Sequence, residues 1–150
     1  MEEKDYLILR EIRVLFNYIR RELNSKTKEF GISGFQSRLL EFIYYKNLKN
    51  EEVVQKDLER IFNSSKSNMC ELLISMENSG LINRIESSTQ RAKKIICTTK
   101  GIEMFHKIDT SAEEVEEDIK KDISKSDLDN FNKVIEKMIT NLGGTLSKDN

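Results

Sequence analysis

Residues 53–101 constrain the fold most strongly, because their apolar spacing is helical in two successive runs. These runs consist of Val54, Leu58 and Ile61, and of Met69, Leu72, Leu73 and Met76. Spacing of three and four residues places each run on one buried face of a helix. Residues 62–65, between the runs, supply side chains that tolerate turn geometry and cap a helix start. The segment therefore predicts two helices joined by a tight turn.

A β-hairpin is predicted directly after the second of these helices. Gly80 suits the left-handed backbone conformation that follows a helix end. Residues 81–85 and 92–97 are predicted to be strands, and the residues between them are polar. This loop is too polar to pack on a core, so we expect it to project into solvent or onto a partner. The whole segment predicts a helix-turn-helix followed by a wing.

Two helices are predicted before this unit. The first covers about residues 6–28, where apolar residues at steps of three, four and seven form two lines, which suggests two packing partners. These residues are Ile8, Leu9, Ile12, Leu15, Phe16, Ile19 and Leu23. Residues 31–34 interrupt the pattern before a second helix that ends near Asn47. Asn50, followed by two glutamates, is predicted to cap the next helix.

Two further helices are predicted after the hairpin. Thr98 or Thr99 is expected to cap a long helix with an apolar stripe from Ile102 to Ile119. Residues 126–129 fit a capping box for a final helix, which Gly143 stops. The predicted buried face of that helix is Leu128, Phe131, Val134, Ile135, Met138, Ile139 and Leu142.

The predicted fold class is mostly α with a small β-hairpin wing, an α/β winged helix-turn-helix. The order is helix, helix, helix, helix, hairpin, helix, helix. A chain of 150 residues is most simply one domain, 1–150, within which residues 33–101 form the winged lobe. Residues 5–30 and 100–142 carry more apolar helix surface than this lobe needs. We therefore expect these helices to form a homodimer.

The charge distribution points to a nucleic-acid partner although the net charge is only −1. Residues 81–100 contain five basic residues and one acid, whereas residues 109–129 contain nine acids and three lysines. Neutrality is thus the average of a basic wing and an acidic helix. The acidic helix is expected to face away from any DNA.

Several classes of protein are disfavoured by composition. No apolar run approaches 18 residues and no signal-peptide pattern is present, so we expect a cytoplasmic location and no membrane partner. Cys70 and Cys97 are too few for a disulfide framework, and His106 has no neighbours with metal-ligand spacing. Neither a nucleophile with a base nor a phosphate-binding glycine loop is apparent. We therefore predict no enzyme activity, metal or cofactor.

Four stretches resemble the MarR-type winged-helix transcriptional regulators. They are residues 31–40, 55–58, 76–84 and 91–101, at the family's order and spacing. The resemblance implies a sequence-specific regulator of transcription that binds double-stranded DNA, with the terminal helices as its dimer interface. It further implies a ligand-responsive repressor on a pseudo-palindromic operator. Thr89 departs from the family pattern, since it stands where the wing usually carries an aspartate two residues before Arg91.

The predicted DNA contacts lie on the second helix of the motif and on the wing. They are Ser65, Lys66, Ser67, Asn68, Glu71, Arg84, Arg91, Lys93 and Lys94. The helix residues would enter a major groove, where Asn68 suits adenine and Lys66 suits phosphate. Arg91 would insert into a narrow minor groove. The alternative interpretation is that the lysines are solvated charges, the serines only cap and turn, and Arg91 is an ordinary loop residue.

Regulators that resemble this chain commonly bind a small aromatic effector between the dimer helices and the wing domain. Candidate residues for such a site are Phe16, Tyr18, Phe42 and Tyr45, with Tyr44 beside them. Aromatic residues at helical spacing also serve as ordinary core. The main alternative to DNA binding is a winged-helix module that binds a protein, because the neutral total charge and Glu71 permit it. A purely structural homodimer would leave the basic wing without a purpose.

Overall fold

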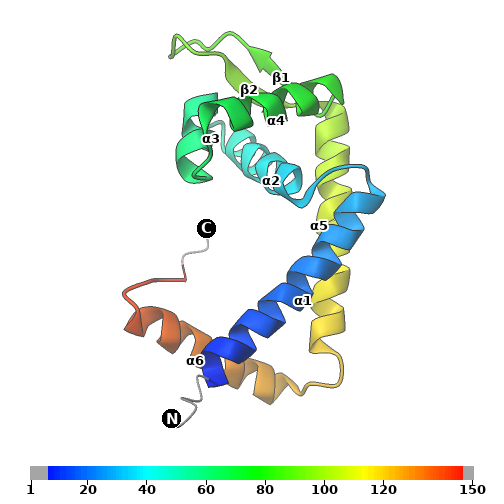
Figure 1. Cartoon of the computed structure of the whole chain (residues 1–150), viewed down its shortest axis with the longest axis vertical. Helices are drawn as coiled ribbons and strands as arrows, with labels where there is room; N and C mark the ends of the chain where they lie inside the picture. The colour runs from blue at the N-terminus through cyan, green and yellow to red at the C-terminus, as the bar shows by residue number, and fades with distance from the viewer. Residues whose placement is uncertain (1–6, 147–150) are drawn as a thin grey trace, which may run out of the picture. The chain divides into compact units, whose positions relative to one another are not determined.

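The computed structural model describes residues 7–146 and contains, within that range, six helices and one two-stranded antiparallel hairpin (Figure 1). In chain order these are α1 (Leu7–Glu29), α2 (Gly34–Leu48), α3 (Gln55–Ile61), α4 (Lys66–Asn78), β1 (Ile82–Ile85), β2 (Lys94–Cys97), α5 (Thr99–Lys120) and α6 (Lys125–Asn141). The predicted order and fold class are confirmed. Two compact units are present, one ending at Val115 and the other beginning at Glu116. Among the helices described, none is long and apolar enough to cross a membrane.

The core of the first unit is built from the helix faces that periodicity predicted. Fully buried residues come from α2, α3, α4 and the hairpin, and include Leu39, Leu40, Ile43, Leu58, Met69, Leu73, Met76, Ile82 and Ile95. Leu72 is half-buried beside them. Ile61 was expected in this core but is 48% exposed. The helix ends at Ile61, and the next ring, Phe62, packs between Phe35 and Phe42 instead.

The hairpin is fastened to the chain segment that precedes α3. Its register pairs Ile82 with Cys97 and Ile85 with Lys94, so both strands are shorter than predicted. The N–H of Ile95 also donates to the carbonyl of Val53 at 2.7 Å, and Val54 forms an isolated bridge with Lys94. This segment therefore pairs with the second wing strand.

The predicted cap at Asn50 is wrong. Helix α3 begins at Gln55, and the Asp57 carboxylate accepts from the N–H of Val54 at 3.2 Å to satisfy its first turn. Asn50 instead adopts a left-handed turn with φ of 58°. Val53 and Val54 are buried and pair with the wing, and β-branched residues such as these favour an extended backbone. Glu51 and Glu52 therefore precede the helix and do not lie in its first turn.

The other helix ends follow the predicted chemistry with one shift. Ser65 caps α4, and the hydroxyl of Thr98 accepts from the Gly101 N–H at 3.0 Å at the start of α5. The final helix is capped by Ser124 rather than Ser126, since the Ser124 hydroxyl accepts from the Asp127 N–H at 3.1 Å. Gly80 and Gly143 have φ of 74° and 80°, as expected of residues that end a helix.

Both terminal helices have the predicted apolar stripes, but these stripes are open in the single chain. On α1, Ile8 is 54% exposed and Ile12 and Leu15 are also exposed. Helix α6 has no buried residue, and Phe131 and Val134 are about half exposed. The prediction that α6 has a buried face is therefore wrong for one chain alone. Contiguous exposed apolar stripes such as these mark surfaces available to a partner.

Candidate nucleic-acid interface

Helix α4 presents a polar face opposite its buried residues. Ser67, Asn68 and Glu71 are exposed on this face, beside exposed Ser65 and Lys66 at the helix start. Met69, Leu73 and Met76 anchor the other side in the core. Its thirteen residues make a helix about 20 Å long, and a helix is about 10–12 Å across with its side chains, which fits a DNA major groove about 12 Å wide. The structure thus brings together the five residues predicted on this helix.

The first turn of α4 already has internal contacts. The Ser65 hydroxyl accepts from the Asn68 N–H at 3.2 Å, so the capping role expected of one of the serines is confirmed. The Asn68 side-chain amide donates to the Ser64 hydroxyl at 3.1 Å. From α3, Gln55 donates to the Lys66 carbonyl at 3.3 Å and joins the two helices of the motif. These contacts fix the end of α4 from which Ser67 and Lys66 project.

The tip of the wing exposes its basic side chains. Arg91 is exposed and makes no hydrogen bond or ion pair with any residue between 7 and 146. The ammonium group of Lys93 lies 4.0 Å from the carboxylate of Glu86, and both side chains are mostly exposed. An exposed ion pair at this distance contributes little to stability. Both cations are therefore available to an anionic partner.

Arg84 has a different environment on the first wing strand. Its guanidinium group donates to the Glu77 carboxylate at 2.7 and 3.0 Å, and its backbone N–H donates to the same group at 3.3 Å. The guanidinium holds the pKa of Glu77 below its usual range. Because Glu77 lies in the last turn of α4, this pair fastens the first wing strand to that helix.

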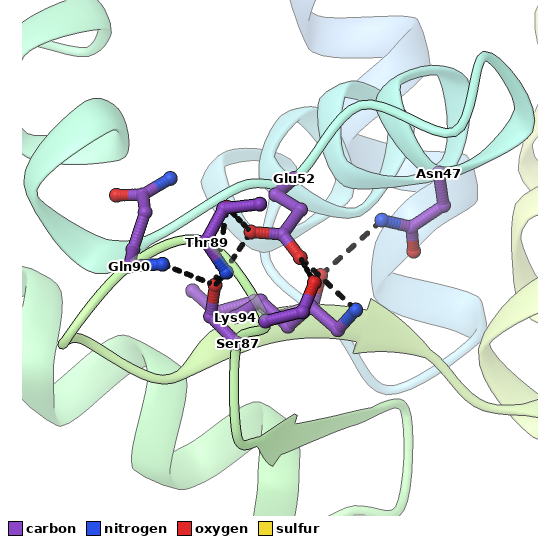
Figure 2. A network of polar contacts seen from close by, with 8 residues as sticks. Asn47, Glu52, Ser87, Thr89, Gln90 and Lys94 are labelled. Atoms are coloured by element: carbon purple, nitrogen blue, oxygen red, sulfur yellow. Dashed lines mark hydrogen bonds and ion pairs between the residues drawn. The ribbon is translucent and has the colours of Figure 1, made fainter.

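Lys94 is also paired, and its partner is a carboxylate that the sequence pattern places in the first turn of a helix. Its ammonium group donates to Glu52 at 3.1 Å, and Glu52 further accepts from the hydroxyls of Ser87 at 2.6 Å and Thr89 at 2.5 Å (Figure 2). These hydrogen bonds lower the pKa of Glu52 to about 2. Sequence reasoning missed Glu52 as a wing residue because only tertiary pairing brings it there.

Asn47 is a second residue that sequence reasoning missed. Its side chain donates to the Ile95 carbonyl at 3.2 Å and accepts from the Cys97 N–H at 2.8 Å. Asn47 lies at the end of α2, and its side chain thereby provides hydrogen-bond partners for backbone groups of the second wing strand. No pattern in the sequence distinguishes it from other asparagines near a helix end.

A groove of about 760 Å³ lies between α3, α4 and the hairpin. Its lining includes four cations and two carboxylates, and consists of Gln55, Lys56, Glu59, Lys66, Glu77, Arg84, Ala92, Lys93 and Ile95. Glu77 is neutralised by Arg84, so the lysines set the sign of the potential in the groove. An extended anionic chain suits such a surface.

The four predicted effector residues fall into two separate groups. Phe16 and Tyr18 are exposed on α1, with the guanidinium groups of Arg20 and Arg21 at 6.0 and 4.7 Å from their ring centroids. Phe42 packs on Phe62 with centroids 5.8 Å apart, and Tyr45 packs on Phe105 at 5.4 Å. Within residues 7–146, no ring contact joins the first group to the second.

The cysteines and the histidine show no reactive arrangement. Cys97 is half-buried, and this burial raises the pKa of its thiol to about 11, so the residue stays protonated at neutral pH. Cys70 is half-buried on α4. The described part of the chain contains no group of three or more possible metal ligands.

Comparisons with solved structures agree on the fold. MepR from Staphylococcus aureus, a transcription regulator of the multidrug efflux pump MepA, is similar with a TM-score of 0.79, 21% identity and coverage of 93% of this chain and 98% of MepR. MepR in complex with DNA gives a TM-score of 0.72, 19% identity, and coverage of 93% and 99%. A putative MarR family transcriptional regulator from Clostridium acetobutylicum gives 0.70, 24% identity, and coverage of 91% and 97%.

Comparisons that use the sequence alone find no match. No protein-family profile and no curated protein sequence matches the chain. At the level of the fold, these likenesses support the resemblance noted in the sequence, since a putative MarR family regulator is among the neighbours and the matches cover most of the chain. The chain has the MarR-type winged-helix fold.

Proposed function

We propose that this chain is a sequence-specific regulator of transcription that binds double-stranded DNA as a homodimer. The observation that carries the proposal is the combination of an exposed polar face on α4 with a wing loop whose Arg91 has no hydrogen-bond or ion-pair partner among residues 7–146. This pairing occurs on the fold of MepR, a protein solved in complex with DNA. Since fold alone does not define function, these residues carry the assignment to DNA binding.

In the proposed complex, α4 lies in the major groove. Ser67 and Asn68 then meet base edges, and Lys66 meets a phosphate. One sugar-phosphate strand follows the groove between α4 and the hairpin, where Lys56 and Lys93 stand beside Lys66. Arg91 reaches the adjacent minor groove, where a narrow A·T tract concentrates negative potential.

Dimerisation follows from the open apolar stripes. Those on α1 and α6 leave residues such as Ile8 and Phe131 more than half exposed in one chain, which is costly in water. A second copy would cover them. A twofold dimer then requires a pseudo-palindromic operator with half-sites about 34–36 Å apart.

We further propose that the protein is a cytoplasmic repressor and that it responds to a small aromatic effector. MepR regulates a multidrug efflux pump, and the exposed rings of Phe16 and Tyr18 on α1 offer apolar surface for such a molecule. Phe42 and Tyr45 have ring partners in the first unit, so α1 is the better place to search for effector contacts.

The alternative proposal is a winged-helix module that binds a protein. Glu71 and Ile74 are both exposed on α4, and a carboxylate beside an exposed apolar residue suits a protein surface better than a phosphate backbone. Only one such acid is present among the predicted contact residues of α4. DNA is therefore the first partner to test.

The test is a fluorescence-anisotropy titration with DNA upstream of the chain's own coding sequence, across a salt series. Scrambled DNA of the same length serves as competitor. We expect a preference for the upstream fragment and a log–log salt slope corresponding to roughly 6–10 neutralised phosphates. Absence of binding even at low salt would favour the protein-binding module.

A further inference from the structure

Glu52 connects the wing loop to the segment before α3. Its carboxylate accepts from the hydroxyls of Ser87, Ser88 and Thr89 at 2.6, 3.5 and 2.5 Å, and from the Lys94 ammonium at 3.1 Å. Figure 2 shows the side chain pointing from its loop into the turn of the hairpin. One carboxylate thus collects donors from the wing loop and from the second wing strand.

The Ser87 hydroxyl links the Glu52 carboxylate to the backbone of the wing loop. While it donates to Glu52, this hydroxyl accepts from the N–H groups of Thr89 at 3.1 Å and Gln90 at 2.8 Å. The conformation of the loop just before Arg91 therefore depends on a hydroxyl that Glu52 orients. An ionised acceptor makes hydrogen bonds roughly twice as strong as a neutral one.

Glu52 itself is held in place without these contacts. The backbone of the next residue, Val53, pairs with Ile95 at 2.7 Å, and Val53 and Val54 are buried. The Glu52 side chain is 19% exposed, whereas the Glu86 side chain on the same loop is 84% exposed. A substitution at Glu52 can consequently alter the loop while the fold and the strand pairing remain.

We infer that Glu52 is the positioning residue that holds the wing ready for DNA, in place of a carboxylate on the wing itself. Thr89 stands where the resemblance implies an aspartate, and here it donates to Glu52. The inference rests on the proposed function and deepens it. It names how the DNA-binding wing is ordered in this chain.

The arrangement has a consequence for Arg91. A carboxylate at position 89 would order the loop by pairing with the arginine, and that pairing would offset part of its charge. Here the loop is ordered through hydroxyls and Lys94, and Arg91 keeps no partner within the described residues. The wing is thus ordered while the charge at its tip remains fully available to DNA.

The first experiment measures the order of the loop in the free, full-length protein. Backbone ¹⁵N order parameters are recorded at Thr89 and Gln90 in the wild type, in Glu52→Gln and in Glu86→Gln. We expect values near 0.85 in the wild type and below about 0.6 in Glu52→Gln. Glu86→Gln is the matched control and should leave them unchanged, because the one ion pair that Glu86 makes with the described residues is long and exposed. Unchanged values in Glu52→Gln would overturn the inference whether or not the protein binds DNA.

The second experiment asks whether Glu52 acts through Arg91. Binding of the upstream DNA, with A·T-rich or G·C-rich flanks, is compared for Glu52→Gln, Arg91→Ala and the double variant. We expect Glu52→Gln to weaken binding about fivefold on A·T-rich flanks only, with no further loss in the Arg91→Ala background. An equal loss on both flanks, or a full additional loss in the double variant, would assign Glu52 a general structural role and overturn the inference. If the wild type binds neither DNA, the proposed function fails while the order parameters still decide the role of Glu52.

Discussion

The strands and the loop of the wing hold their basic residues in opposite ways. In the strands, Arg84 is bound to Glu77 and Lys94 to Glu52, both at 3.1 Å or less. In the loop, Arg91 has no partner within the described residues, and the one partner of Lys93 among them lies 4.0 Å away. Four basic residues that look alike in the sequence thus divide into two that fasten the hairpin and two that face outward.

The difference teaches that a basic wing is not a uniform electrostatic surface. A cation already paired with a carboxylate gives little net attraction for phosphate, because binding DNA would have to break the first pair. A free cation releases counterions from DNA on contact and so contributes directly to affinity. Burial and pairing, rather than residue type, therefore separate predicted positioning residues from predicted contact residues.

The largest expected effect is that of Arg91→Ala on affinity. Loss of a minor-groove contact should weaken binding to A·T-rich flanks by about tenfold, with little change on other flanks. The unfolding midpoint should stay the same, since Arg91 is exposed and makes no hydrogen bond or ion pair within the part of the chain described. Titrations on two flank sequences check this. Equal losses on both would make Arg91 a phosphate contact instead.

Arg84→Ala should show the opposite pattern. It removes both side-chain bonds to Glu77, so that this partly buried carboxylate keeps the backbone N–H of residue 84 but loses its guanidinium partner, and the free energy of unfolding should fall by about 1 kcal/mol. Affinity should then decline on every DNA alike, because the whole hairpin loosens. Urea denaturation measures the first effect. A variant with unchanged stability but altered sequence preference would place Arg84 among the contacts.

Lysines 93 and 94 offer a finer comparison between neighbours in the sequence. Lys93→Ala should lower the slope of log affinity against log salt by about one, as expected for a lost phosphate contact. Lys94→Ala should change the slope much less, because its ammonium group is bound to Glu52. Salt titrations of the two variants test the distinction. Equal slope changes would show that the ion pair between Lys94 and Glu52 breaks when the protein binds DNA.

The smallest expected effect concerns pH. The pKa of Glu52 is lowered from 4.5 to about 2 by its hydrogen-bond donors, so its stabilisation is complete above pH 4.5 and is lost as pH falls toward 2. The amide resonances of Thr89 and Gln90 should therefore be constant between pH 5 and 8. A transition of these resonances near pH 4.5 in the folded protein would contradict the lowered pKa.

Periodicity predicted the helices because core packing and local sequence agree there. The spacing of Leu58, Leu73 and Met76 is enough to place them in the core, where all three are fully buried. The cap of α6 was misplaced because Ser124 and Ser126 both precede an aspartate by three residues. Local chemistry permits either start, and only the fold selects Ser124.

The candidate site was predictable in part. Exposure of Ser67, Asn68 and Arg91 follows from the helix stripe and the polar loop. The role of Glu52 was not predictable, because local signals favoured a helix start at Asn50 and the strand pairing of Val53 overrides them. Contacts across more than thirty residues of sequence, such as Glu52 with Ser87, leave no periodic trace.

The most direct test of the central claim is a hydroxyl-radical footprint of the protein on the DNA upstream of its own coding sequence. Two protected half-sites about one helical turn apart, flanked by minor-groove protection that disappears with Arg91→Ala, are the predicted result. A homogeneous protein that protects no position at saturating concentration and low salt would contradict the claim.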